Sequence, residues 1–133
     1  MEKQIKNYKD LIVWKKSMEL VNKVYTLTKK FPRDELFGLS SQMRRSAISL
    51  PSNIAEGHRR GTRKDYAHFI TIAFGSGAEL ETQILIAKNQ NYCSNKECES
   101  IDILLEEIMK MLNVLQSKLK STPPPSTPHP PTP

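Results

Sequence analysis

A cluster of basic side chains between residues 58 and 64, in the run HRRGTRK, is the part of the sequence best suited to bind an anion. Its cations flank the expected start of a helix at Thr62, where positive charge opposes the helix dipole and does not help the helix to form. Together with the free N–H groups of a helix N-terminus, they make a concentrated positive site for phosphate. A solvated charged turn explains the same residues equally well. The predicted nucleic-acid-binding residues, with one arginine added from the preceding helical segment, are Arg44, Arg59, Arg60, Arg63 and Lys64.

Other residue types that could carry chemistry lack the necessary spacing. His58, His68 and His129 never lie four residues apart, so a helical pair of metal ligands is absent. Cys93 and Cys98 have no second Cys or His pair that could complete a tetrahedral site, and we interpret them as ordinary turn cysteines. No carboxylates are clustered at a spacing suited to Mg²⁺. We therefore expect no metal, no cofactor and no enzymatic activity.

Polar side chains recur at steps of three and four residues along two of the expected helices. If the chain folds back near residue 60, Arg45 can reach Ser76 or Glu79. In the same register, Glu56 can meet a cation at the start of the following helix. Because buried polar groups need partners, we interpret this line as a polar seam within the bundle or between subunits, and an anion site is the alternative. The predicted seam residues are Gln42, Arg45, Ser49, Asn53, Glu56, Ser76 and Glu79, and Gln83 continues the line.

The elements that must position these residues are long helices, because apolar residues recur at spacings of three and four. The first pattern follows Asp10, a candidate N-cap, and ends before Pro32. The second runs from residue 36 to residue 54 and contains Pro51, which should kink the helix without ending it. The apolar stripe predicted for the first helix consists of Leu11, Trp14, Met18, Val21, Tyr25 and Thr28.

Two further helices follow the basic turn. The third pattern spans residues 66–87, with Thr62 and Asp65 resembling a capping box before it. Glycines at 75 and 77 lie inside this pattern and not after a strand, so they predict close approach of two helix backbones. The fourth pattern spans residues 101–119 and starts from Ser94 and Glu97. Short loops make sequential helices antiparallel neighbours, so the predicted fold class is all-α, an antiparallel up-and-down four-helix bundle.

The length of 133 residues predicts one domain, which we place at residues 1–120. The uncharged, proline-rich segment 121–133 is predicted to be a disordered, extended tail. No run of 18 apolar residues and no secretory h-region occurs, so neither a membrane span nor a signal peptide is expected. With only two cysteines, the simplest expectation is a cytoplasmic protein with reduced thiols.

The net charge of +6 is unevenly distributed along the chain. Residues 1–30 carry eight Lys/Arg against three Asp/Glu, and residues 31–65 carry seven against four. Residues 66–120 carry five against seven. The first half is therefore the candidate surface for a polyanion.

Three segments identify a family resemblance: YKDLIVWKKSMEL, FPRDELFGLSSQ and the run from Gln42 to Ile84. They resemble the small proteins encoded in intervening sequences of bacterial 23S rRNA genes, and the related accessory variability determinants of diversity-generating retroelements. The resemblance covers roughly residues 8 to 115. The sequence departs from the family pattern at Gly77, where a larger apolar residue is usual and where looser packing is expected. The matching positions are Trp14, Phe31, Pro32, Glu35, Gly38, Leu39, Gln42, Arg44, Arg45, Ser49, Pro51, Asn53, Ile54, Ala55, Glu56, Gly57, Arg60, Phe69, Gly75, Ser76, Glu79 and Glu81.

The resemblance implies a four-helix bundle that assembles into a homopentameric barrel without catalytic activity. In the retroelement branch it implies binding of nucleic acid and of a partner reverse transcriptase. Both branches share the motif, so two functional hypotheses stand. The first is a basic oligomer that binds RNA or DNA through phosphates with low sequence specificity. The second is a structural or scaffold oligomer whose surface recruits a protein.

Overall fold

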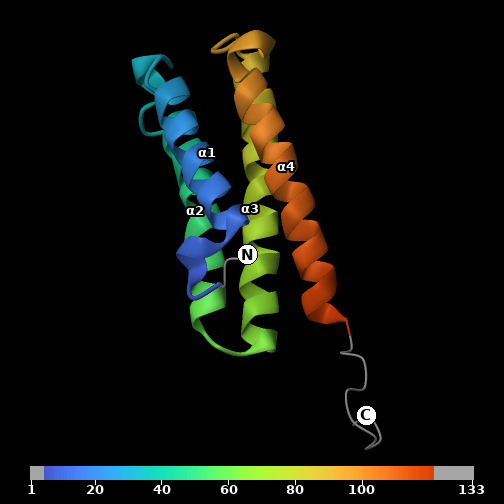
Figure 1. The fold of residues 1–133 in the computed structure, drawn as a ribbon. Helices are drawn as coiled ribbons and strands as arrows, with labels where there is room; N and C mark the ends of the chain where they lie inside the picture. The colour runs from blue at the N-terminus through green and yellow to red at the C-terminus, as the bar shows by residue number, and fades with distance from the viewer. Residues whose placement is uncertain (1–4, 122–133) are drawn as a thin grey trace, which may run out of the picture.

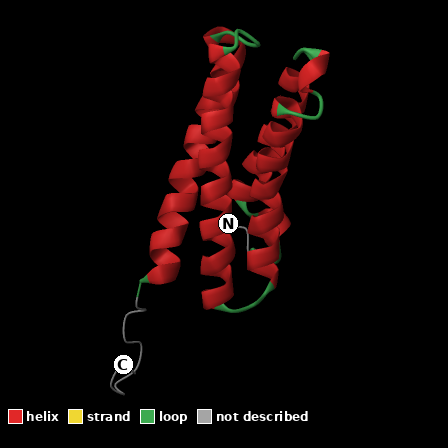
Figure 2. Cartoon of the chain, turned by 180° about the vertical axis from the view of Figure 1, so that it is seen from behind, coloured by secondary structure: helices red, strands yellow, loops and turns green. Residues whose placement is uncertain are grey.

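The chain forms four long helices that run alternately up and down in sequence order (Figure 1). The computed structural model describes residues 5–121, and the predicted tail lies outside them except for Ser121. The helices are α1 (Ile12–Thr28), α2 (Leu39–Arg59), α3 (Arg63–Asn89) and α4 (Asn95–Lys120), with short 3₁₀ turns η1 (Tyr8–Asp10) and η2 (Arg33–Glu35). No strand occurs within the described range (Figure 2). The predicted all-α four-helix architecture is confirmed.

The helix starts follow local signals in α3 and α4. The Thr62 hydroxyl accepts from the N–H of Asp65 at 3.1 Å, which caps α3. Ser94 and Glu97 form the predicted capping box of α4, with reciprocal contacts of 3.1 and 2.9 Å.

The prediction that Asp10 caps α1 is wrong. Its carboxylate accepts instead from the N–H groups of Lys6 and Asn7, at 2.9 and 3.3 Å, so it closes the capping box of η1. Helix α1 begins at Ile12, and its N-cap residue Leu11 makes no side-chain cap bond. The Asp10 carboxylate is therefore used in the capping box of η1, the turn that precedes α1.

The second helix begins later and ends later than its apolar pattern suggests. Residues 33–35 form η2, and the Glu35 carboxylate accepts from the Leu39 N–H at 3.1 Å. This bond satisfies one of the free donors at the start of α2. The helix then continues through the buried Pro51 to Arg59.

The core is formed by the predicted apolar faces of α2, α3 and α4, but by a different face of α1. Along α1 the buried residues are Val13, Ser17, Leu20, Val24, Leu27 and Thr28, while Met18 is 39% exposed. Trp14 and Val21 pack only against its edge. Of the predicted stripe only Thr28 is buried, and the rest of the prediction is wrong because apolar residues cover a wide arc of this helix and the polar Ser17 interrupts the buried line. Its hydroxyl can be buried because it donates to the Val13 carbonyl at 2.7 Å.

The two glycines of the third helix do not serve the predicted backbone approach. A Cβ on Gly77 would overlap the Met109 side chain from α4, which fills the space, so the expected loosening does not occur. A Cβ on Gly75 would meet nothing within 4 Å. The close approach of α2 to α3 occurs instead at Gly57, where a Cβ would lie 2.8 Å from the Phe69 Cβ.

Candidate nucleic-acid interface

The basic turn lies at the end of the bundle where α2 passes into α3 (Figure 1). Gly57 lets the last turn of α2 lie against Tyr66 and Phe69. Gly61 has a φ of 84°, a conformation that residues with a side chain rarely adopt, and it makes the reversal in three residues possible. Thr62 then starts α3. The cations of the basic turn therefore lie on or beside a short loop whose conformation is set by Gly57, Gly61 and Thr62.

Arg59 and Arg60 are both exposed but have different partners. The Arg59 guanidinium carbon lies 5.6 Å from the ring centre of Tyr8, and within residues 5–121 its N–H groups make no hydrogen bond. Arg60 donates to Glu56 at 3.0 Å and lies over the Phe69 ring at 5.1 Å. The sequence predicted that Glu56 would meet a cation at the start of α3. This prediction is wrong, because Glu56 pairs with Arg60 at the end of its own helix. One helical turn separates this pair, which favours the local contact.

Arg63 crosses to the C-terminal end of α4. Its guanidinium donates to the carbonyls of Leu119 at 3.1 Å, Ser121 at 3.5 Å and Lys118. These oxygens belong to the negative end of α4, where a cation is favourable. A cation at the N-terminus of α3 is unfavourable for the dipole of α3 alone. Antiparallel packing, however, places the C-terminus of α4 beside Arg63, where its charge is favourable.

Lys64 is exposed and has no ion pair or hydrogen bond with another described residue. His58, the first residue of the turn, is half-buried and meets Tyr66 edge to face at 5.5 Å. Burial raises the pKa of Tyr66, so that phenol stays neutral. Among the described residues, Lys64 and Arg59 are thus the cations of the turn that form no hydrogen bond or ion pair.

Arg44 does not join this turn. It lies 15 positions before Arg59 on α2, a helical distance of about 22 Å. Its Nε donates to the Thr28 hydroxyl at 2.9 Å, and its guanidinium lies 4.7 Å from the Tyr25 ring centre. The contacts connect α2 to α1, so Arg44 is separated in space from the rest of the predicted set.

The predicted polar seam is an open groove between α2 and α3 with a volume of about 420 Å³. Its central contact is a hydrogen bond of 2.7 Å between the hydroxyls of Ser49 and Ser76. Asn53 donates to both the carbonyl and the hydroxyl oxygen of Ser49, at 2.8 Å each. Arg45 and Glu79 line the same groove, but Ser76 bonds to Ser49 and not to Arg45, so the α2–α3 register differs from the expected one. The lining residues are Gln42, Arg45, Ser46, Ser49, Ser76, Glu79 and Gln83.

Ser46 and Gln83 are buried residues that line the groove. Ser46 was not among the predicted seam residues, because the predicted polar line ran from Arg45 directly to Ser49. Gln83 is 9% exposed, and its Oε1 atom is buried without a hydrogen-bond partner in the described part of the chain. A buried acceptor without a donor is costly, so this end of the groove is incomplete in the single chain.

Sequence reasoning missed a third polar cluster at the opposite end of the bundle. The Tyr92 hydroxyl donates to Glu35 at 2.7 Å. Together with the Leu39 N–H, this donor lowers the pKa of Glu35. Nearby, Phe37 is 93% exposed. No spacing rule connects Glu35 with Tyr92, because they come from different loops.

Neither a metal centre nor a membrane span emerges from the described residues. Within residues 5–121, His, Cys, Asp and Glu form no group of three that could hold a metal ion. None of the helices in this range combines the length and the apolar character needed to cross a bilayer.

Comparison with known proteins gives a family and a structural neighbour. The family model for 23S rRNA-intervening sequence proteins matches residues 9–114. A crystal structure at 1.70 Å of a protein of unknown function, from the S23 ribosomal protein family of Bacteroides thetaiotaomicron VPI-5482, is similar to this chain with a TM-score of 0.73 and 28% identity. The similarity covers 83% of this chain and 100% of that one. Curated proteins include no significant match. The chain belongs to the family of 23S rRNA-intervening sequence proteins.

Proposed function

We propose that this protein is a non-enzymatic, oligomeric nucleic-acid-binding protein that contacts the phosphate backbone of RNA or DNA with low sequence specificity. The observation that carries the proposal is the exposed pair Arg59 and Lys64 at the α2–α3 turn, neither of which is paired with a carboxylate of residues 5–121. This turn belongs to residues 1–65, which hold fifteen Lys/Arg against seven Asp/Glu. Residues 66–120, with five against seven, form the less basic half.

The surroundings of the turn favour phosphate over other anions. The first N–H groups of α3 have no intrahelical acceptor, and the 27-residue helix directs the positive end of its dipole toward the same place. Arg60 can add a third contact, since its bond to Glu56 is about half exposed on both sides. No aromatic side chain of the turn lies free for base stacking, because Tyr66 packs on His58 and Phe69 lies under Arg60. Backbone contacts without base contacts produce low sequence preference.

The polar groove supports assembly into an oligomer, which we propose to be a homopentamer. Gln83 needs a donor that residues 5–121 do not supply, and Arg45 and Glu79, which line the same groove, are exposed. Ile72 and Ile86 lie three or four positions from the seam residues of α3 and are 39% and 43% exposed. A polar centre with exposed apolar side chains beside it resembles a subunit contact more than a free surface. Several copies of the basic turn in one particle would strengthen binding to a long polyanion.

A scaffold that recruits a protein, such as a reverse transcriptase, is the second candidate function. One observation favours it: Phe37, 93% exposed, projects at the end of the bundle away from the basic turn. A fully exposed aromatic side chain is a common anchor at protein–protein contacts. The two functions would use opposite ends of the molecule, so they can be tested separately.

A salt series with charge-matched variants tests the nucleic-acid hypothesis. We expect binding to duplex DNA and structured RNA that weakens steeply between about 50 and 200 mM salt. In R59A/K64A, the slope of log affinity against log salt should become shallower by about two for each basic turn that contacts the nucleic acid, because each turn loses two phosphate contacts. The control K96A/K110A removes the same charge from exposed lysines of α4 and should leave most of the slope unchanged.

Two outcomes would count against the proposal. Absence of binding at low salt would reject nucleic-acid binding altogether. An equal change in the two double variants would show that net charge, and not the basic turn, controls the affinity. Light scattering in the same buffer measures the assembly, and a strictly monomeric particle would contradict the oligomer.

A further inference from the structure

The turn between α3 and α4 is held on both sides by backbone caps. After α3, the N–H of Tyr92 donates to the Ala87 carbonyl at 2.9 Å and the N–H of Asn91 to the Lys88 carbonyl at 3.0 Å. With Asn91 at a φ of 62°, this is the Schellman arrangement that closes many helices. The capping box of Ser94 starts α4 only two residues later. Cys93 is the single residue between the two caps.

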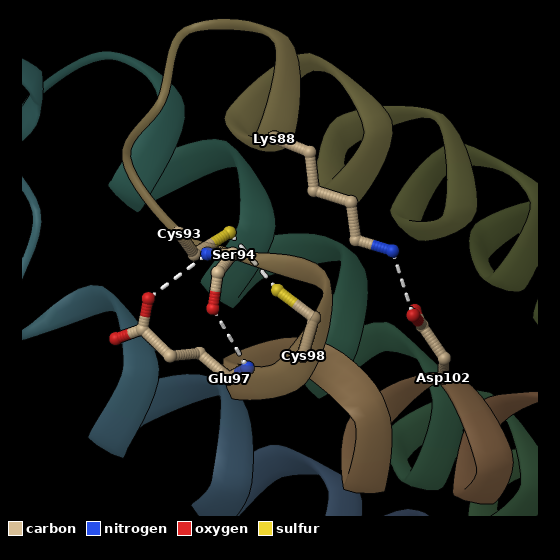
Figure 3. Close-up of polar contacts among 6 residues, drawn as sticks. All are labelled: Lys88, Cys93, Ser94, Glu97, Cys98 and Asp102. Atoms are coloured by element: carbon tan, nitrogen blue, oxygen red, sulfur yellow. Dashed lines mark hydrogen bonds and ion pairs between the residues drawn. The ribbon is translucent and has the colours of Figure 1, made fainter.

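These caps place the two cysteines of the chain side by side. Cys93 directly precedes the N-cap of α4, and Cys98 is the fourth residue of that helix. Apolar side chains at these two positions often pack together as a hydrophobic staple, which sets the angle at which the chain enters the helix. Here both members are thiols, 5% and 0% exposed, and their Sγ atoms are 2.9 Å apart (Figure 3). Two sulfur atoms at this distance are closer than ordinary van der Waals contact.

We propose that Cys93 and Cys98 are a reversible oxidation site, at which a small-molecule disulfide such as glutathione disulfide converts the staple from a packing contact into a covalent bond. The inference is independent of the nucleic-acid proposal. Its basis is that the caps already hold the sulfurs together, so bond formation needs little rearrangement of the folded chain.

The chemistry proceeds in two exchange steps. One cysteine loses its proton, and its thiolate attacks a sulfur of glutathione disulfide, expelling one glutathione thiolate. The second cysteine then loses its proton and attacks the protein sulfur of the mixed disulfide, expelling the other glutathione. The protons end on the two glutathione thiols. Two cysteines are oxidised to one disulfide, and one glutathione disulfide is reduced to two glutathiones.

Burial makes the site resistant in the closed state. Desolvation raises the pKa of the Cys98 thiol to about 12, so it is a poor first nucleophile. The nearest cation, Lys88, is paired with Asp102 at 2.7 Å (Figure 3). The first attack therefore falls to Cys93, which lies in the turn and becomes accessible when the turn opens locally. Oxidation should be slow but should end in the intramolecular product.

The bond would also hold the neighbouring polar cluster in place. Tyr92 adjoins Cys93 and donates to Glu35, whose other oxygen accepts from the first N–H of α2. Opening of the α3–α4 turn must release this contact. Closing the staple covalently should therefore slow exchange of the amide hydrogens in residues 90–98, by about tenfold.

The experiment uses the full-length protein in glutathione disulfide, followed by acid quenching, intact mass and peptide mapping. We expect the folded wild type to lose two hydrogen atoms, to remain a single chain on a non-reducing gel and to recover its mass with dithiothreitol. C98S should instead stop at a glutathione adduct on Cys93. Hydrogen exchange of the oxidised wild type should show the slowing in residues 90–98.

Other products would overturn the inference. A stable glutathione adduct on the folded wild type, or a disulfide between chains, would show that the two sulfurs do not react with each other. A folded wild type that stays reduced while the urea-unfolded chain forms the intramolecular bond would show that the staple prevents oxidation. Because the decisive readouts come from the wild type, they do not depend on the folding of a variant.

Discussion

Replacing Gly57 with alanine tests the contact that brings α2 against α3 and so shapes the basic turn. The new Cβ would lie 2.8 Å from the Phe69 Cβ and 3.3 Å from the Tyr66 carbonyl oxygen. Both atoms are tied to the backbone of α3, so the helix itself must move by several tenths of an ångström. Overpacking of this kind costs about 1–3 kcal/mol.

The same substitution also has a favourable term. Alanine in a helix is more stable than glycine by about 0.5–1 kcal/mol, because less backbone entropy is lost on folding. The steric cost exceeds this gain, so the free energy of unfolding should fall by about 1 kcal/mol in net terms. Gly75→Ala is the matched control, because Gly75 lies inside α3 and its Cβ would meet nothing within 4 Å. That variant should gain about 0.5–1 kcal/mol.

Urea denaturation followed by circular dichroism measures both variants. All samples must have the same protein concentration, since assembly would make stability depend on it. The reasoning is refuted if Gly57→Ala is stabilised as much as Gly75→Ala, which would mean that α3 yields without cost. It is also refuted if Gly75→Ala is clearly destabilised, because nothing in its surroundings opposes a methyl group.

Three further substitutions separate structural from binding roles. Glu56→Gln should free Arg60 and tighten nucleic-acid binding at low salt. The free energy of unfolding should change by less than about 0.5 kcal/mol, because the Glu56–Arg60 pair is half exposed. Unchanged affinity in a binding titration would argue against Arg60 as a phosphate contact. Arg63→Ala should lower stability by about 0.5–1 kcal/mol in urea denaturation while the salt slope of binding stays the same, since its donors are engaged at the end of α4. Tyr92→Phe should raise the pKa of Glu35, measured by NMR titration, toward its ordinary value of 4.5. Because the pKa of Glu35 is lowered in the folded protein, the contact stabilises the wild type fully at pH values above the ordinary pKa of 4.5. This stabilisation is lost as the pH falls through the lower folded-state pKa, so the Tyr92→Phe variant should lose less stability on acidification than the wild type.

Local signals predicted most of the helical architecture. Ser94 with Glu97 marked the start of α4, and Thr62 marked the start of α3, because a cap depends only on residues three positions apart. The short turn at Gly61 also made it predictable that polar residues of α2 and α3 would face one another, but not which would pair, because Ser76 meets Ser49 and not Arg45.

The failures share a physical cause. The inner face of α1 was misassigned because its apolar residues span a wide arc, and only packing against α2 and α4 selects the line through Leu20. Arg63 was predicted to bind phosphate because its charge opposes the dipole of its own helix, α3. Its partners are instead carbonyls at the end of α4, more than fifty residues away in the sequence. Glu35 and Tyr92 likewise meet only when two loops are brought to the same end of the bundle.

What the sequence by itself determined is therefore the number and order of the helices and the caps of α3 and α4, together with the family and the asymmetry of charge. Tertiary structure alone decided which cations stay without a hydrogen-bond or ion-pair partner among the described residues and which connect one helix to another. It also turned two cysteines of no evident pattern into a buried pair. Periodicity and caps act over a few residues, while the partner of a long side chain depends on the rotation and register of every helix, which the shared core sets.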